Sequence, residues 1–332
     1  MKKRALSILL SLVLVLGLVP VSTFADSAGS AHTHCVCGKS DCGDESHGGE
    51  LTWIGISSLS EINSIGGTGH YYLKQSVTIN DRWLLYENNI TLCLNGYSII
   101  CRNSVEGDTM YTTILNHGNL TITDCGTTGT IEYYNPSHPG VTVYNRAGTF
   151  NLWNGTISGN DSGAGLFNGE NCNMYGGRIR NNTTSDTYSS GGVINGGSTA
   201  ASKRAGVKVE SYGTFNLYAG TIKGFGSGVA VQKSATFKMY GGAISGNHSD
   251  SAGGGVAVQK DGSFEMYGGS IAGNSAATYG GGVYDNVAYV TLYGGSITGN
   301  TAGTQGGGIY NTAKADDSVY DTRDKKITLY PT

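Results

Sequence analysis

The residues best suited to chemistry gather near the N-terminus, where thiols and imidazoles lie close together in the chain. They are His32, His34, Cys35, Cys37, Cys42 and His47. Thiolate and imidazole are the ligands that zinc prefers, and four of them suffice for a closed structural site. The Cys-x-Cys-x4-Cys spacing is not that of a zinc finger, so a disulfide, or neither a metal nor a disulfide, remains an alternative. A catalytic zinc is not expected, because no general base is identifiable.

The first 25 residues have the pattern of a secretory signal peptide. Three basic residues follow Met1, an apolar stretch runs from Leu6 to Val19, and small residues precede Ala25. Such a stretch is short for a membrane span and typical of a signal peptide. We therefore expect residues 1–25 to be removed and the protein to be secreted or held at the cell surface, with a retained membrane anchor as the alternative. No second apolar segment of spanning length follows, so no membrane insertion is expected after cleavage.

The composition excludes two further classes of protein. Glycine accounts for 54 of the 332 residues and proline for only four, and the glycines follow no three-residue period, which excludes collagen. The formal net charge is −3. A chain without a basic surplus is poorly suited to a phosphate backbone, so nucleic acid is not an expected partner.

An internal repeat predicts the fold. The segment 237–247 (FKMYGGAISGN) recurs at 264–274 and 290–300, and in looser form at 150–160, 172–182 and 215–225. The second apolar residue of each copy serves as an anchor: Leu92, Ile122, Leu152, Met174, Leu217, Met239, Met266, Leu292 and Leu329. Apolar and polar residues alternate within each copy, which is the period of a β-strand.

The short repeat leaves no room for crossover helices between its strands. Parallel strands that are joined only by tight corners must coil into a parallel β-helix, a solenoid. We therefore expect an all-β chain of about 9 to 11 coils, stacked about 4.8 Å apart. The expected organisation is a Cys/His-rich appendage at 26–50, a capping region at 51–88 and the repeats at 89–332.

The corners of the coils account for the glycine content, because glycine adopts positive φ without penalty. A column of asparagines, which also tolerate left-handed geometry, ends the repeats. Their amides are expected to stack as a hydrogen-bonded ladder, a structural role rather than a binding one. The column consists of Asn160, Asn182, Asn247, Asn274 and Asn300.

The repeat resembles that of right-handed parallel β-helix proteins that bacteria secrete or display at their surface. Those proteins carry runs of the form F-x-M-Y-G-G-x-I-x-G-N followed by G-G-G-V, and this chain has such runs at 237–256 and 264–283. The segments HTHCVCG at 32–38 and LCLNG at 92–96 add to the resemblance. The resemblance implies right-handed coiling and an adhesin-like role.

Two longer gaps between anchors indicate loop insertions at one corner of the coil, at about 195–210 and 311–326. The first holds Lys203, Arg204 and Lys208, and the second holds Asp316, Asp317, Asp321, Arg323 and Asp324. They are either mobile surface loops or the rim of a binding face, since loops on a rigid scaffold often carry function.

An aromatic column is expected on the outside of the coils, one ring per repeat. Its members are Trp153, Tyr175, Tyr218, Tyr240, Tyr267, Tyr293 and Tyr330. Rings on successive coils would lie about 5 Å apart, and each stacked pair would contribute about 0.5–1.5 kcal/mol, so stability alone could explain the column. The alternative is a platform that binds a polysaccharide or a host or matrix surface.

The other cysteines are expected to be structural. Cys172 takes a phenylalanine position of the repeat and should be buried as a small hydrophobe. Cys93 and Cys125 fall on adjacent coils and could pair, but spacing alone does not fix connectivity.

No constellation of catalytic residues stands out. Glycoside hydrolysis needs two carboxylates at the scissile bond, whereas the acidic residues here are scattered, and the adjacent pair Asp316–Asp317 falls in an expected loop. We therefore expect a binding or adhesion protein without catalytic residues. The alternatives are a structural spacer of a larger surface protein and, less favoured, a polysaccharide lyase or glycoside hydrolase.

Overall fold

The computed structural model describes residues 32–38, 51–64, 67–102, 111–126, 128–134, 140–159, 165–181, 205–312 and 328–329. All of them belong to one compact unit, residues 32–332. Among the described residues the only helix is α1 (Ser60–Ser64), and none is long and apolar enough to cross a membrane. The expected signal peptide, residues 1–25, lies outside the described residues.

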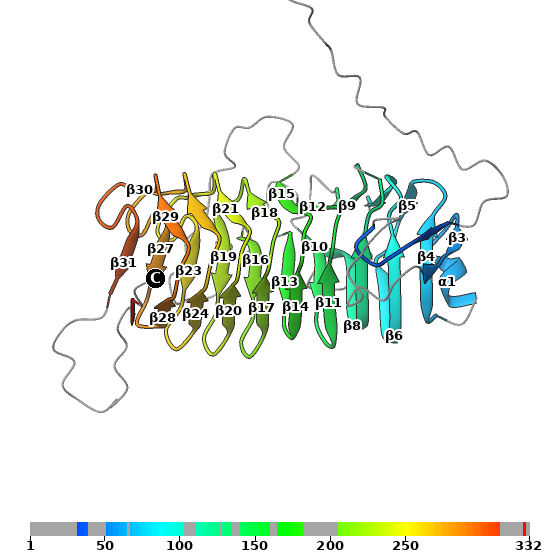
Figure 1. Cartoon of the computed structure of the whole chain (residues 1–332), viewed down its shortest axis with the longest axis horizontal. Coiled ribbons are helices and arrows are strands. Elements are labelled where there is room, and N and C mark those ends of the chain that lie inside the picture. The colour runs from blue at the N-terminus through cyan, green and yellow to red at the C-terminus, as the bar shows by residue number, and fades with distance from the viewer. Residues whose placement is uncertain are drawn as a thin grey trace, which may run out of the picture. The chain divides into compact units, whose positions relative to one another are not determined.

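Parallel strands build the described part of the chain, as the sequence predicts (Figure 1). The largest sheet contains β3 (Ile54–Ile56), β4 (Gly69–Leu73), β6 (Trp83–Cys93), β8 (Tyr111–Thr123), β10 (Gly140–Asn145), β11 (Thr149–Leu152), β13 (Leu166–Asn168), β14 (Asn171–Met174), β16 (Ala205–Val209), β17 (Thr214–Leu217), β19 (Ser227–Val231), β20 (Thr236–Met239), β23 (Val256–Val258), β24 (Ser263–Met266), β27 (Val283–Asp285), β28 (Tyr289–Leu292), β31 (Ile309–Asn311) and β32 (Thr328–Leu329).

Two smaller parallel sheets and one antiparallel pair complete the fold. One sheet contains β5 (Val77–Ile79), β7 (Ser98–Cys101), β9 (Thr130–Tyr133), β12 (Thr156–Gly159), β15 (Arg178–Asn181), β18 (Thr221–Lys223), β21 (Ala243–Ser245), β25 (Ser270–Ala272) and β29 (Ser296–Thr298). The other contains β22 (His248–Ser249), β26 (Ser275–Ala276) and β30 (Thr301–Ala302). At the N-terminal end, β1 (Thr33–His34) pairs antiparallel with β2 (Leu51–Thr52).

The strands repeat in coils, each stacked on the one before. β20, for example, pairs in parallel with β17 of the preceding coil and with β24 of the following one. This arrangement is consistent with a parallel β-helix. The pairing already begins at β3, which pairs with β4, so parallel strands extend into the segment 51–88 that the sequence predicts as a capping region.

The predicted column of apolar anchors is confirmed. The register aligns successive anchors directly, and the members from Leu152 to Met266 are at most 1 % exposed: Leu152, Met174, Leu217, Met239 and Met266. Leu292, in the last complete coil, is partly buried against this core. Cys172 pairs in register with Phe150 and Phe215 and is buried, also as predicted.

The asparagine ladder is confirmed for the three members that the structure describes. The Asn247 amide donates to Asn274 Oδ1 at 2.9 Å, and the Asn274 amide donates to Asn300 Oδ1 at 3.0 Å. The positive φ at these corners belongs to the preceding glycine, as at Gly246 (φ 60°) and Gly273 (φ 64°), and not to the asparagine. The ladder therefore provides hydrogen-bond partners for the side-chain amides inside the corner. The other two members, Asn160 and Asn182, lie outside the described residues.

A second buried ladder was not predicted. The Asn116 amide donates to Asn145 Oδ1 at 2.7 Å, and the Asn145 amide donates to Asn168 Oδ1 at 2.8 Å. All three side chains are fully buried. The same column continues in later coils with valines and then with Asp285.

The first predicted insertion needs a correction. Residues 205–209, which were expected in a loop, form strand β16, and Val207 pairs with Val229 of the next coil. The core position of this coil is thus taken by Val207, which aligns with Leu166 of the preceding coil. Lys208 lies on this strand, with its ammonium group 3.6 Å from Glu210. Lys203, Arg204 and the charged residues of the second insertion lie outside the described residues.

Candidate metal centre and aromatic ladder

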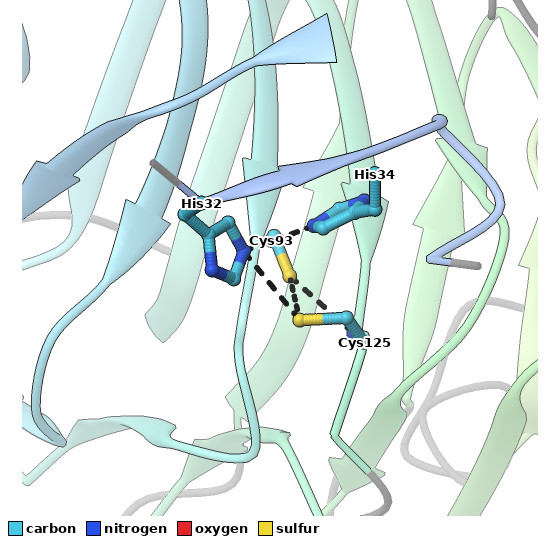
Figure 2. Close-up of side chains that lie close together, drawn as sticks. All are labelled: His32, His34, Cys93 and Cys125. Atoms are coloured by element: carbon cyan, nitrogen blue, oxygen red, sulfur yellow. Dashed lines mark hydrogen bonds between the residues drawn. The ribbon is translucent and has the colours of Figure 1, made fainter. Parts of the chain in front are cut away.

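Four potential metal ligands converge at the N-terminal end of the coils. They are His32, His34, Cys93 and Cys125, and their ligand atoms all lie within 4.8 Å of one another (Figure 2). The two imidazole Nε2 atoms are 3.0 Å apart, the two sulfurs are 3.1 Å apart, and Cys125 Sγ lies 3.5 Å from His32 Nε2. This group could hold a metal ion.

Three separate stretches of chain supply these ligands. Cys93 ends β6, and Cys125 lies two residues beyond the end of β8, so consecutive coils bring the two thiols together. His32 and His34 approach from the segment 32–38, which lies beside the coils and pairs with β2. Residues alternate sides along an extended segment, so both imidazoles of the His-x-His motif reach toward the sulfurs, as Figure 2 shows.

The backbone around Cys125 is fixed by the preceding carboxylate. Asp124 is 2 % exposed and accepts hydrogen bonds from the amides of Gly96 (2.6 Å), Gly126 (3.2 Å) and Gly129 (2.9 Å). Burial raises the pKa of Asp124, and these three donors oppose the shift. Three hydrogen bonds on one carboxyl group hold the turn that presents the thiol.

A hydrogen bond sets the protonation pattern of His34. Its Nδ1 lies 2.7 Å from the carbonyl oxygen of Cys35, and a carbonyl can only accept, so Nδ1 carries the proton. With Nδ1 occupied in this way, Nε2 is the ring atom that faces the cluster. Histidines that bind metals usually donate their other ring N–H in this way.

The electrostatics of the two thiols differ. The pKa of Cys125 is lowered to about 3, because the Cys93 thiol donates to its sulfur and the two imidazoles add further hydrogen bonds. Burial raises the pKa of Cys93 well above its usual value, and the neighbouring Cys125 sulfur reinforces the shift. The cluster therefore favours one thiolate and one thiol, and a bound cation would favour a second thiolate.

Aromatic side chains enclose the group. The His32 ring stacks on Tyr72 with centroids 4.0 Å apart, and the His34 ring lies 4.2 Å from that of Trp53. Trp53 also donates its indole N–H to the His34 carbonyl at 2.9 Å. Gly38 closes the segment against the coil, where a Cβ would lie 2.8 Å from the Asp124 carbonyl oxygen.

The predicted metal ligands divide into three groups. His32 and His34 lie in the cluster. Cys35 and Cys37 lie outside it and form a separate pair, with sulfurs 2.7 Å apart. Cys42 and His47 lie outside the described residues. The repeat predicts that Cys93 and Cys125 lie on adjacent coils, but nothing in the sequence predicts that they lie beside the histidines. The one sequence signal for Cys93 is the LCLNG motif that contains it.

The predicted aromatic ladder forms on the outer side of the coils. Ring centroids of successive members lie 4.2–4.9 Å apart, with interplanar angles of 5–15°, from Trp153 through Tyr175, Tyr218, Tyr240 and Tyr267 to Tyr293. Tyr218, Tyr240 and Tyr267 are 40 %, 40 % and 39 % exposed, and the members at either end are partly buried. Tyr330 lies outside the described residues.

The stacking decides which part of each ring a ligand could reach. Nearly parallel rings at this spacing cover one another's faces, so each inner ring presents its edge and hydroxyl group to solvent. The Tyr267 hydroxyl donates to Glu265 at 2.6 Å, which raises its pKa. Glu265 is also 3.2 Å from the Lys238 ammonium group.

A polar column runs beside the ladder on the same strands. The Asn173 amide donates to Asn151 Oδ1 at 2.9 Å, and the Asn216 amide donates to Asn173 Oδ1 at 2.9 Å. In the next two coils the column continues with Lys238 and Glu265, which pair in register and whose charges cancel. The outer face from β11 to β24 thus combines amides, hydroxyls and ring edges with little net charge.

Comparison of the chain with protein-family models, with curated proteins and with solved structures finds no match, so the chemistry of these two features has to be judged from their geometry.

Proposed function

We propose that this chain is a right-handed parallel β-helix protein of the secreted or cell-surface kind, and that its outer face binds an extended polysaccharide, free or displayed on a host or matrix surface. The unbroken aromatic ladder from Trp153 to Tyr293 carries the proposal. Its central rings stay about two-fifths exposed, and exposed aromatic surface of this extent is typical of interaction sites.

The geometry supports recognition by hydrogen bonds more than by stacking. Because neighbouring rings cover each other's faces, a sugar cannot lie flat on an inner ring. The groups within reach are the tyrosine hydroxyls and the amides beside them, repeated once per coil at about 4.8 Å. A neutral polymer with many hydroxyl groups suits such a row, whereas a highly charged one would find no balancing charge. No catalytic step is part of this proposal.

Binding to a glycan array, followed by calorimetry on the best ligand, tests the proposal. The variant Tyr240→Ala/Tyr267→Ala should bind about 5- to 150-fold more weakly, since each of the two lost hydrogen bonds contributes about 0.5–1.5 kcal/mol. Its far-ultraviolet circular dichroism should stay that of the wild type. The matched control is Tyr212→Ala, because Tyr212 is 82 % exposed and lies outside the ladder.

A conservative pair of substitutions separates hydroxyl recognition from ring contact. Tyr240→Phe/Tyr267→Phe keeps the stacking and removes the hydroxyls, so it should lose most of the affinity that the alanine variant loses. Wild-type affinity in the phenylalanine variant would contradict hydroxyl recognition. Wild-type affinity in both variants would reduce the ladder to a structural role and leave a spacer as the better account.

We further propose that the ion held by the four-residue cluster is zinc in a structural role. A tetrahedral zinc with two nitrogen and two sulfur ligands has edges of about 3.3 Å between nitrogens, 3.6 Å between nitrogen and sulfur and 3.8 Å between sulfurs. The nitrogens, at 3.0 Å, and one nitrogen–sulfur pair, at 3.5 Å, lie close to these values. The sulfurs, at 3.1 Å, would have to move apart by about 0.7 Å to reach the tetrahedral edge. Four protein ligands complete the coordination shell, as in structural sites.

Metal analysis of the reduced full-length chain tests the choice of ion. After exposure to equal concentrations of zinc, cobalt(II) and manganese(II) and removal of free metal, the chain should retain one zinc ion. Retention of cobalt or manganese in its place would contradict zinc.

A further inference from the structure

Cys93 of the metal cluster lies on the same outer column as the aromatic ladder. The register pairs Tyr72 with Cys93 and Cys93 with Thr123. The next coil aligns Leu152 with Ile122, so Trp153, the first ring of the ladder, follows Thr123 in this column. One continuous column therefore runs from Tyr72 at the cluster into the open ladder.

Exposure changes sharply along this column. Tyr72 is 8 % exposed, and Cys93 and Thr123 are fully buried, whereas Tyr218 is 40 % exposed. Residues at equivalent outward positions of successive coils should have similar exposed fractions if nothing covers them. The low exposure of Tyr72, Cys93 and Thr123 therefore indicates that other groups of the protein cover them. The covering groups are the stacked His32 ring and Trp53, which packs in one apolar cluster with Tyr72 and Cys93.

Among the described residues, backbone pairing holds this cover over only a short length. β1 pairs with β2 over only two residues. Beyond that pairing, Trp53 donates its backbone N–H to the His32 carbonyl at 3.3 Å and its indole N–H to the His34 carbonyl at 2.9 Å. A two-stranded pairing of this length is marginal in water on its own, and segments with so small an apolar core usually need a metal or a disulfide.

We propose that the metal ion is a latch: by joining His32 and His34 to Cys93 and Cys125, it folds residues 32–38 onto the coils and covers the N-terminal end of the outer column. Metal release frees the segment and opens the column as far as Tyr72. The inference rests on the proposed metal centre and not on the proposed polysaccharide. Because the segment must fold onto the coils before all four ligands can bind the ion, the free energy of metal binding stabilises the folded segment. Tighter metal binding therefore makes the covered state more stable.

Hydrogen exchange on the reduced full-length chain, with and without one equivalent of zinc, tests the latch. Amides in peptides covering 32–38 and 51–53 should exchange at least about tenfold more slowly with zinc. Amides of β17 and β20 should exchange at the same rate in both states, because the ion touches neither strand. Equal exchange of 32–38 with and without zinc would overturn the proposal.

Variants separate the proposed ligands from the other cysteines. Cys93→Ser/Cys125→Ser should abolish the effect of zinc on 32–38, whereas Cys35→Ser/Cys37→Ser should keep it. Cys172→Ala serves as a matched control, since Cys172 is buried in a different column. Zinc-dependent protection that survives in Cys93→Ser/Cys125→Ser, or is lost only in Cys35→Ser/Cys37→Ser, would assign the ion to other ligands and overturn the latch.

The outcome is independent of the polysaccharide. A chain that binds no glycan but shows zinc-dependent protection supports the latch and contradicts only the binding proposal. Protection that another divalent ion confers equally well supports the latch and contradicts only the choice of zinc. Wild-type protein treated with a chelator and then with zinc provides the measurement even if a cysteine variant fails to fold.

Discussion

Asp285 places a carboxyl group in a fully buried column, and its replacement by asparagine should stabilise the protein at neutral pH. The side chain is 0 % exposed. Its Oδ1 accepts the Ala288 amide at 2.8 Å, and its Oδ2 has no hydrogen-bond partner among the described residues. Asn311 occupies the same column one coil later, so an amide is already accommodated next to this position.

The magnitude follows from the pKa of the carboxyl group. Burial raises the pKa of Asp285 from 3.8 to about 6, and the hydrogen bond from Ala288 opposes the shift. Between these values the folded protein keeps a proton that the unfolded chain has lost, so the free energy of unfolding falls as the pH rises. The loss is at most about 1.4 kcal/mol per pH unit and should total about 2–3 kcal/mol above pH 6.

Urea unfolding of the wild type and Asp285→Asn at a series of pH values measures this directly. The variant keeps the Oδ1 acceptor and removes the ionisation, so it should match the wild type near pH 4 and exceed its stability by about 2 kcal/mol at pH 7. The exposed Asp81→Asn provides the control for a general change of charge. Parallel pH profiles of the wild type and Asp285→Asn, or a less stable variant at pH 7, would refute the reasoning.

Four substitutions at three positions test the packing of the coils by the same unfolding assay. Met239→Asp should cost at least about 3 kcal/mol by burying an unpaired carboxyl group, whereas Met239→Leu should cost less than about 1.5 kcal/mol; similar losses would show that the column is not a core. Asn274→Ala should cost about 1–3 kcal/mol, because the Asn247 amide loses its acceptor, and an unchanged midpoint would deny the ladder a role in stability. Gly254→Ala should destabilise strongly, since the new Cβ would collide with the Ser275 carbonyl oxygen, and a neutral effect would contradict the close approach of these coils.

The repeating parts of the molecule could be predicted from the sequence because each depends on a local period. Each coil contributes one residue to the anchor column and one ring to the ladder. Alignment of the repeat copies therefore predicts that Met239 lies beside Met266 and Tyr240 beside Tyr267, as the structure shows. Strand β16, which contains Val207, was missed for a related reason. A Gly-Gly-Val triplet at 191–193 resembles the triplet that opens the repeat strand at 254–256, so residues 195–210 were assigned to a loop.

Only two of the four residues in the metal cluster, His32 and His34, could be predicted as ligands from the sequence. The histidines stood out because they lie beside other cysteines in the chain, but their partners are Cys93 and Cys125, which are distant in sequence. Their meeting depends on the segment 32–38 lying beside the coils, which no period in the sequence encodes. The buried ladder of Asn116, Asn145 and Asn168 was missed for another reason, since each copy is flanked by different residues.

Anomalous X-ray scattering at the zinc absorption edge, from crystals of the reduced full-length protein, tests most directly whether one ion joins the N-terminal segment to the coils. We expect a single strong peak between the sulfurs of Cys93 and Cys125 and the Nε2 atoms of His32 and His34, about 2.0–2.3 Å from each. A peak bound to Cys35 and Cys37, or no peak while 32–38 still lies against the coils, would contradict it.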